Sequence, residues 1–438
     1  MKKKLILINP VDYSGKNLAL SPGNKYPPLG LGIIAALTPK HWDVEIIDEN
    51  YSMFHYRPAD LVGITSYTAN INRAYRIASI FKKNNIHTVI GGIHATLLPD
   101  EALNYADTIV VGEAEEIWSR VICDFENNSV KRKYKGSYHS MVNLPVPRRD
   151  LFHKNYWHSA IQTSRGCPMS CDYCSVPKIN GKRYRFRPSG EVLDEIESIS
   201  QKSVFFVDDN LFGNNTSNRE RAVDLFEGMI KRGIKKEWFT FASVNCADDE
   251  EVLKLAYRSG CKMLFIGIET EDIEALNCSG KYLNLSSAKQ SYKPLLNKIH
   301  KHGIGIIGGI IYGFDTDTPQ KLQNRTSFCA RSHIDSYHLC TLTPFPGTKL
   351  FDRLKYEDRL LYDNFPSDWS KFSWNEIVIK LKSSSQEDLK KGIINAHKKL
   401  YNKTFLKWKY FRTLFSTKSF SAARWAYYTN KFIKESYK

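Results

Sequence analysis

Two successive series of short apolar runs, each run followed by a stretch with helical periodicity, dominate this sequence. In the first series, which spans residues 1–125, strands and helices alternate, so a parallel sheet with helices on both faces is expected. The predicted strands are residues 5–9, 44–48, 61–65, 88–91 and 109–112, and the acids at 113–116 predict a first helical turn. The sequence therefore predicts a doubly wound, Rossmann-like α/β domain, whose ligand would lie at the carboxyl ends of the strands.

The second series spans residues 161–350 and contains six predicted strands. A closed barrel of this type needs eight strand–helix units, so the series predicts a partial, six-stranded (β/α) TIM-type barrel. Residues 126–160 are polar, basic and proline-containing, which predicts a linker, and residues 351–438 are predicted to form a helical C-terminal region. The six predicted strands are residues 161–164, 204–208, 238–243, 264–269, 304–312 and 337–343.

The net charge of +17, from 63 lysines and arginines against 46 acids, is concentrated near the end of the chain. Residues 390–438 hold thirteen lysines and arginines and one acid, Glu435, and so carry +12 of it. The apolar fraction of 42% excludes a disordered or collagen-like chain. No apolar run reaches the ~18 residues of a membrane span, and the short run at residues 5–8 predicts a strand rather than a signal peptide. A cytoplasmic protein is expected.

Three of the nine cysteines, Cys167, Cys171 and Cys174, lie within eight residues, directly after a predicted strand. Three thiolates on one loop can hold three irons of a [4Fe–4S] cluster and leave the fourth iron open to a ligand. A zinc site would need a fourth cysteine or histidine nearby, and none follows Cys174 at short spacing. Of the remaining cysteines, only Cys340, late on the last predicted strand, is a candidate for contact with the chemistry.

The spacing of these cysteines, with Tyr173 just before the third, resembles the radical S-adenosylmethionine (radical SAM) superfamily. The resemblance implies that the cluster binds S-adenosylmethionine and cleaves it reductively to a 5′-deoxyadenosyl radical. It makes Cys167, Cys171 and Cys174 the metal ligands and catalytic residues, and it places Tyr173 near the adenine.

Motifs at the ends of the later predicted strands are similar to those of the same superfamily. The resemblance implies that Asp208 and Asp209 bind the methionyl amino group, that Ser243, Asn245 and Glu269 contact ribose and methionine, and that Gly309 and Gly313 lie beside the adenine. Each motif also has a structural interpretation. An Asp-Asp pair can cap a helix, Glu269 can form an ion pair, and the glycines can permit close packing.

The first domain resembles the cobalamin-binding domain that is fused to many radical SAM enzymes, in the motifs at residues 26–32, 60–66, 91–96 and 111–115. Paired glycines at a strand end let a flat macrocycle approach the backbone. The Asp-x-His-x-x-Gly motif of classical corrinoid domains is absent from the sequence. His94 is therefore expected to orient its loop more than to bind cobalt, and a domain without corrin remains an alternative. The candidate cobalamin contacts are Thr65, Ser66, Gly91, Gly92, His94, Gly112 and Glu113.

Together the resemblances imply a cobalamin-dependent radical SAM enzyme that methylates an unactivated carbon of a small-molecule or lipid-like substrate through methylcobalamin. An electron donor such as flavodoxin or ferredoxin would reduce the cluster. A radical cyclisation or rearrangement with the same cofactors is the first alternative. An RNA-modifying enzyme is the second and is disfavoured, because Cys123 is the only cysteine before the cluster. A non-catalytic corrin or iron–sulfur sensor is the third.

Aromatic residues alternate with lysines and arginines in residues 401–438. Such a mixture can lie in an anionic membrane interface, pack as helices on the barrel, or stack on nucleic acid. Nucleic acid is the least favoured partner. The expected location is the cytoplasm, with a peripheral site at the inner membrane face as one interpretation.

Overall fold

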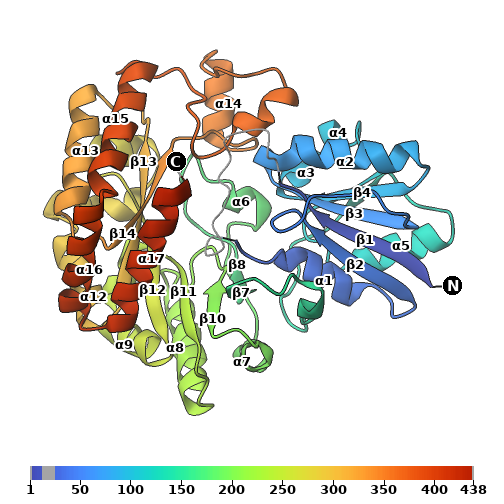
Figure 1. The fold of residues 1–438 in the computed structure, drawn as a ribbon, viewed down its shortest axis with the longest axis horizontal. Coiled ribbons are helices and arrows are strands. Elements are labelled where there is room, and N and C mark those ends of the chain that lie inside the picture. The colour runs from blue at the N-terminus through green and yellow to red at the C-terminus, as the bar shows by residue number, and fades with distance from the viewer. Residues whose placement is uncertain (1, 12–24, 437–438) are drawn as a thin grey trace.

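The computed structural model describes residues 2–11 and 25–436, which form two α/β units side by side (Figure 1). The N-terminal unit has a parallel six-stranded sheet in the order β2-β1-β3-β4-β5-β6. Its strands are β1 (Lys3–Asn9), β2 (Trp42–Asp48), β3 (Leu61–Ser66), β4 (His87–Gly92), β5 (Thr108–Val111) and β6 (Lys133–Lys135). The predicted doubly wound domain is confirmed.

Helices cover both faces of this sheet. The apolar stripe of α2 (Ile71–Lys83) packs on one face through Ala74, Ala78 and Phe81. On the other face, α1 (Leu29–Leu37) and α5 (Trp118–Glu126) pack through residues such as Leu31 and Val121. The short helices η2 (Thr68–Asn70), α3 (Ile93–Leu97) and α4 (Pro99–Ala102) lie at or near strand ends. Buried faces of this kind supply most of the stability of such helices.

Two sequence predictions about this unit are wrong. Residues 113–116 do not begin a helix, since α5 starts at Trp118, and the acids there form ion pairs instead. The predicted linker at 126–160 is also not free of structure. It contributes β6, which pairs with β5, and its last residues belong to the first barrel strand. The strand β6 has only one buried apolar residue, Tyr134, so it gave no periodic signal.

The second unit has six parallel strands in the order β14-β13-β12-β11-β10-β7, which confirms the partial barrel. A short antiparallel hairpin, β8 (Ser164–Arg165) with β9 (Arg185–Phe186), brackets the cysteine loop and the helix α6 (Val176–Ile179). The strands are β7 (His158–Ile161), β10 (Ser203–Phe206), β11 (Glu237–Ala242), β12 (Cys261–Glu269), β13 (Gly305–Tyr312) and β14 (Ser336–Thr341). The principal helices of this unit are α7 (Ser189–Ser198), α8 (Thr216–Lys231), α9 (Glu250–Arg258), α10 (Ile273–Cys278), α11 (Leu285–Gln290), α12 (Lys293–Lys301) and α13 (Pro319–Arg331).

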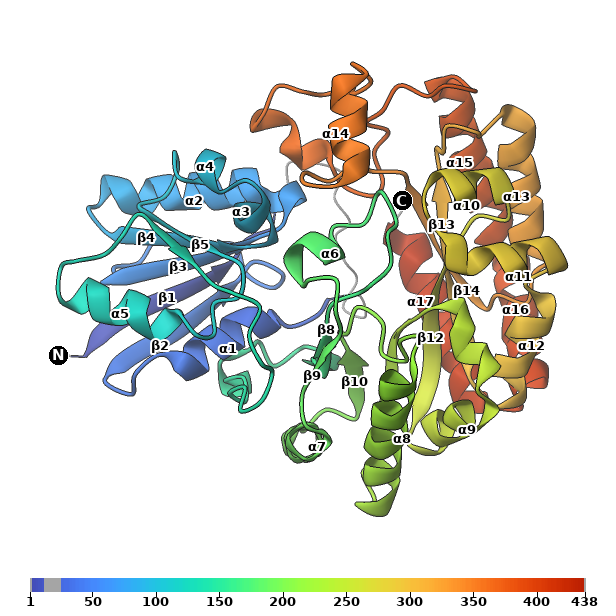
Figure 2. The ribbon, with the colours of Figure 1, turned by 180° about the vertical axis from the view of Figure 1, so that it is seen from behind.

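The chain after the barrel returns to the N-terminal unit before it ends on the barrel. The helix α14 (Lys349–Tyr356) and the turn η6 (Ser367–Lys371) share one hydrophobic core with α2, through Phe351 and Trp369. The Trp369 indole N–H also donates to Glu101 of α4 at 2.9 Å. This segment therefore joins the two units above the cysteine loop, as Figure 2 shows from behind.

Three helices complete the chain: α15 (Gln386–Leu400), α16 (Lys403–Thr417) and α17 (Phe420–Ser436). The helix α17 lies against the barrel strands (Figure 1), where Ala426 packs in one cluster with Phe239, Met263 and Ile307. Small residues on this face, including Ala422 and Ala423, let the helix approach the strands closely. The expected helical packing of the tail on the barrel is therefore present. None of the helices within the described residues has the length and apolar character needed to cross a membrane.

Candidate cluster and cofactor sites

A glycine and an aspartate side chain fix the start of the cysteine loop. Gly166 has a φ of +97°, and a Cβ there would lie 2.1 Å from the Arg183 carbonyl oxygen, so no other residue fits without a shift. The Asp209 carboxylate accepts hydrogen bonds from the Gly166 amide (2.8 Å) and from the Asn180 side chain (2.9 Å). The start of the loop is thereby fixed to the end of β10.

Cys167, Cys171 and Cys174 line one cavity of about 180 Å³, and all three are free thiols. Burial raises the pKa of each thiol, that of Cys174 to about 12, while the nearby Lys281 lowers it. Thiols in such a site become thiolates when a cation replaces their protons. Among the described residues, the cavity lining offers no fourth cysteine and no histidine. This donor set fits a [4Fe–4S] cluster with three protein ligands and one open iron.

Several residues predicted to bind S-adenosylmethionine line the same cavity: Tyr173, Asp209, Ser243 and Glu269. The Ser243 hydroxyl accepts a hydrogen bond from Asn210 at 2.9 Å. Glu269 ends β12 with a φ of +65°, which is a strained conformation for a residue with a side chain. The structure therefore brings together carboxylates, a hydroxyl and an aromatic ring beside the three thiols, and these groups fit the ammonium, ribose and adenine of that cofactor.

Two of the predicted contacts do not face this cavity. Asp208 is fully buried, accepts hydrogen bonds from the Thr163 amide (2.6 Å) and the Ser164 hydroxyl (2.7 Å), and pairs with Arg221. Asp208 holds the segment between β7 and β8, and of the two predicted carboxylates only Asp209 lines the cavity. Asn245 does not line the cavity either, because its side chain donates to the Gly213 carbonyl.

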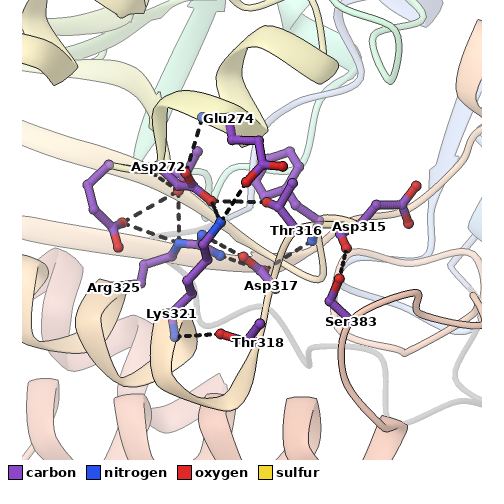
Figure 3. A network of polar contacts seen from close by, with 12 residues as sticks. Asp272, Glu274, Asp315, Thr316, Asp317, Thr318, Lys321, Arg325 and Ser383 are labelled. Atoms are coloured by element: carbon purple, nitrogen blue, oxygen red, sulfur yellow. Dashed lines mark hydrogen bonds and ion pairs between the residues drawn. The ribbon is translucent and has the colours of Figure 1, made fainter.

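Neither of the two glycines predicted beside the adenine is among the residues that line this cavity. A Cβ at Gly309 would come within 2.9 Å of the Phe265 ring, so this glycine makes room for a ring that does line the cavity. Gly313 has a φ of +104° and donates its amide to Asp317, which pairs with Arg325 at 2.7 Å. Figure 3 shows this network at the end of β13. Gly313 is therefore a turn residue of a structural network.

Two further residues of the site, Lys281 and Asn210, were not among the predicted contacts. Lys281, which follows α10, lines the cavity and forms an ion pair with Glu269 at 3.1 Å. Asn210 follows Asp209 and bridges Ser243 and the Tyr184 hydroxyl. Lys281 belongs to no sequence motif, whereas Asn210 directly follows the Asp208–Asp209 pair that the resemblance indicates. Cys340 lies 3.0 Å from His338 on β14 and does not line this cavity.

Glu113, predicted to contact cobalamin, lies instead in a buried ion cluster between the two units. It pairs with Arg165 (3.2 Å), two residues before Cys167, and accepts hydrogen bonds from Arg185. Glu115 pairs with Arg165, and His139 lies 2.8 Å from Glu113. The ligand atoms of Glu113, Glu115 and His139 are close enough for a metal ion. The two guanidinium groups already supply the positive charge there, so the cluster is an ionic contact between the units.

His94 is likewise not available as a cobalt ligand. Its side chain is fully buried, and its two ring nitrogens lie 3.2 Å from the Thr68 hydroxyl and 3.1 Å from the Glu101 carboxylate. The ring also contacts the edge of Trp369. His94 thus orients its loop, as the sequence suggested.

The other candidate cobalamin residues lie at the carboxyl edge of the sheet, facing the second unit (Figure 1). Thr65, Gly91, Gly92 and Gly112 are partly exposed there. Gly92 has a φ of +95°, and a Cβ on it would lie 2.8 Å from the Ser66 backbone. The Ser66 hydroxyl donates a hydrogen bond to the Gly91 carbonyl. Bare backbone at this edge fits the close approach of a flat macrocycle.

Known proteins match both units. Residues 15–122 match the B12 binding domain model, and residues 161–329 match the radical SAM superfamily model. The bacteriochlorophyllide d C-12(1)-methyltransferase of Chlorobaculum tepidum is 31% identical over 416 residues, which cover 91% of this chain and 88% of the relative. The hopanoid C-2 methylase of Rhodopseudomonas palustris is 28% identical over 354 residues, which cover 77% and 66%.

A likeness of fold extends over nearly the whole chain. The cobalamin-dependent S-adenosylmethionine radical enzyme OxsB superposes with a TM-score of 0.71 at 13% identity, covering 97% of this chain and 72% of that one. The family models, the relatives and the cavity with three thiols agree on the cofactors, which are a [4Fe–4S] cluster, S-adenosylmethionine and cobalamin. The chain belongs to the radical SAM enzymes that carry a cobalamin-binding domain.

Proposed function

We propose that this enzyme methylates an unactivated carbon of an amphipathic polycyclic substrate, with methylcobalamin as the methyl donor. The observation that carries the proposal is the ion pair between Glu113 and Arg165, at 3.2 Å. Glu113 follows the carboxyl end of β5, and Arg165 stands two residues before Cys167. The edge proposed for cobalamin and the cysteine cavity are therefore held next to each other, as a reaction that uses both cofactors on one substrate requires.

In this proposal different residues hold the cluster, S-adenosylmethionine and cobalamin. Cys167, Cys171 and Cys174 hold the cluster, and Tyr173, Asp209, Ser243 and Glu269 orient S-adenosylmethionine. The partly exposed edge residues Thr65, Gly91, Gly92 and Gly112 hold cobalamin. When bound, the cluster supplies the electron for reductive cleavage of S-adenosylmethionine, and cobalamin supplies the methyl group. A one-electron donor such as flavodoxin or ferredoxin reduces the cluster.

The substrate class follows from the relatives together with the cavity walls. The two curated relatives act on a bacteriochlorophyllide and on hopanoids, as their names state. Both are polycyclic and poorly soluble in water. The cysteine cavity of this chain has phenylalanine rings, Phe241 and Phe265, in its wall. Such rings exclude water from a radical and offer contact to an apolar ring system.

Anaerobic reconstitution with iron and sulfide, followed by assay with S-adenosylmethionine, a reductant and a chlorophyllide, tests the proposal. The wild-type enzyme should give 5′-deoxyadenosine and a product heavier by one CH₂ unit. Cys171→Ala should lose the visible absorption of the cluster and both products, whereas Cys123→Ser, which removes an exposed thiol on α5 of the other unit, should keep them. Normal cleavage in Cys171→Ala would contradict the cluster assignment. Cleavage by an enzyme that binds no cobalamin would leave a radical enzyme and exclude methyl transfer.

We also propose that the enzyme works in the cytoplasm and touches the inner membrane face through α16. Trp408, Phe411 and Phe415 are 47%, 56% and 77% exposed at helical spacings of three and four, so they form one stripe. Lys407 and Lys418 flank the stripe and are also exposed. Aromatic rings beside lysines suit the interface of an anionic bilayer.

Sedimentation with vesicles that contain a fifth of anionic lipid tests this contact. Trp408→Ser with Phe415→Ser should lower the bound fraction several-fold. Tyr356→Ser, which removes an aromatic ring that is 93% exposed on α14, is the matched control and should bind as the wild type does. Equal binding of all three proteins would exclude α16 as the contact.

A further inference from the structure

A second cavity, of about 460 Å³, lies at the amino ends of the barrel strands, whereas the cysteine loop follows their carboxyl ends. Its wall includes the first residues of three strands, His158, Ser203 and Glu237. The opposite wall comes from α17, through Arg424, Trp425, Tyr428, Thr429 and Phe432. This volume is in the range of cavities that bind small molecules.

Aromatic rings form a large part of this wall. The ring of Tyr26, which reaches the barrel from the N-terminal unit, lies 5.9 Å from that of His158 and 6.0 Å from that of Phe239. The indole of Trp425 lies 5.4 Å from the Phe239 ring. Rings from three separate parts of the chain thus converge on one space, which offers both faces and edges to a flat apolar ligand.

Positive charge gathers around the same cavity. Lys202, Lys235 and Arg424 line it, are exposed, and form no ion pair with any residue of the described ranges. Among the described lining residues the one carboxylate is Glu237, which accepts hydrogen bonds from the Ser421 hydroxyl and the Trp425 indole and is also attracted by Arg424, so three cations stand against one acid. The rim therefore has an excess of positive charge, which complements an anionic group.

This cavity is separate from the one that holds the cysteines. Phe239 of β11 lines this cavity, here called the lower cavity, whereas Phe241 of β11 and Ser243, the residue just after β11, line the cysteine cavity. Four residues of a strand span about 13 Å. Between the two spaces, the Phe205 and Phe241 rings lie 5.3 Å apart, and those of Phe241 and Phe265 lie 5.0 Å apart. A layer of phenylalanines divides the barrel interior.

We propose that the lower cavity is a second binding site, which takes an amphipathic anion: a molecule with a flat ring body among the aromatic residues and a carboxylate or similar group at the rim. This site does not depend on methyl transfer. The site would bind a polycyclic substrate that carries a carboxylate, and equally an unrelated aromatic acid, because both combine a flat apolar ring with a negative charge.

Equilibrium dialysis of the reconstituted full-length enzyme tests the proposal with two probes of the same ring system. These are 8-anilinonaphthalene-1-sulfonate, an anion, and N-phenyl-1-naphthylamine, which is neutral. Arg424→Gln with Lys235→Gln should raise the Kd of the anion about tenfold and leave that of the neutral probe unchanged. Lys254→Gln with Arg258→Gln, which removes two exposed cations from α9, is the charge-matched control.

A second variant tests the aromatic wall. Tyr428→Ala removes a ring that is 39% exposed, so the fold should tolerate it, and both probes should bind more weakly. Trp408→Ser with Phe415→Ser controls for binding of the probes to α16. An anion affinity that is equal in the cavity variants and in both controls would overturn the proposal.

Competition with a chlorophyllide and with naphthalene-2-carboxylate distinguishes the sources of the ligand. Displacement of the anionic probe by the chlorophyllide assigns the cavity to the substrate class, and displacement by the small acid alone assigns it to another aromatic acid. Formation of 5′-deoxyadenosine should persist in the cavity variants. A loss of binding is thereby distinguishable from a failure of the proposed methyl transfer.

Discussion

Lys281 and Glu269 form an ion pair 3.1 Å long inside the cavity that holds the three cysteines. Burial opposes the charge of Lys281, but Glu269 and Cys171 outweigh it, and the pKa of Lys281 is raised. The same ammonium group lowers the pKa of each of the three thiols. A fixed positive charge therefore stands beside the cluster site.

Replacement of this charge should make the cluster harder to reduce. A cation stabilises the more negative, reduced state, so Lys281→Gln should lower the reduction potential by an amount on the order of tens of millivolts. A redox titration monitored by electron paramagnetic resonance (EPR) measures the shift. Lys289→Gln, at an exposed lysine of α11, should titrate as the wild type does. A potential that is the same in both variants would mean that Lys281 does not act on the cluster.

Two adjacent glycines at the proposed cobalamin edge should respond differently to alanine. Gly92→Ala should lower the free energy of unfolding by about 1–3 kcal/mol, because its φ of +95° disfavours a side chain and a Cβ would press on the Ser66 backbone. Gly91→Ala should fold normally, since its Cβ would make only ordinary contacts at 3.7 Å. It should still bind cobalamin more weakly if the macrocycle lies on this backbone. Urea denaturation and cobalamin titration measure the two effects.

Asp208 and Asp209 show which structural features the sequence predicts and which it does not. The order of strands and helices fixed both folds, because apolar periodicity and the parallel connection rules leave few alternatives. The pair Asp208–Asp209 was correctly located at the end of a strand. Which carboxylate faces the cavity depends on the direction of each side chain after the strand ends, and that depends on contacts with Thr163 and Arg221.

Contacts between distant segments account for the other errors. Glu113 and Glu115 looked like a helix start, and only the fold brings Arg165 and Arg185 to them. Lys281 belongs to no sequence motif, because only the fold places it in the cavity beside Glu269. The three cysteines could be expected to share one site because they lie within eight residues on one loop, and they do line one cavity.

His94 should prove to be a structural residue rather than a cobalt ligand. Since its ring nitrogens contact Thr68 and Glu101, His94→Gln should leave the nitrogen splitting in the EPR spectrum of bound cob(II)alamin unchanged. The variant should be less stable, because it disturbs the buried contacts with Glu101 and Trp369. Loss of a nitrogen splitting in the variant would identify His94 as an axial ligand.

Asp335 should contribute stability that disappears at low pH. It is fully buried, lies 2.7 Å from His300, and accepts hydrogen bonds from the Ile306 amide and the Thr413 hydroxyl. Burial alone would raise the pKa of Asp335, but His300, the Thr413 hydroxyl and Lys409 outweigh burial and lower it from 3.8 to about 2. Because the folded-state pKa lies below the unfolded value, the contribution is complete above about pH 4 and is lost as the pH falls towards 2.

The size of this contribution is about 2 kcal/mol, from the shift of the pKa. Urea denaturation at pH 6 and at pH 3 measures it as a double difference between the wild type and Asp335→Asn. The variant should be less stable at pH 6, and the gap should narrow at pH 3, because the wild-type carboxylate is then losing its advantage. Asp358→Asn, at a side chain that is 91% exposed, should show no gap at either pH. A gap for Asp335→Asn that is equally large at both pH values would show that the packing of this residue, and not its charge, stabilises the fold.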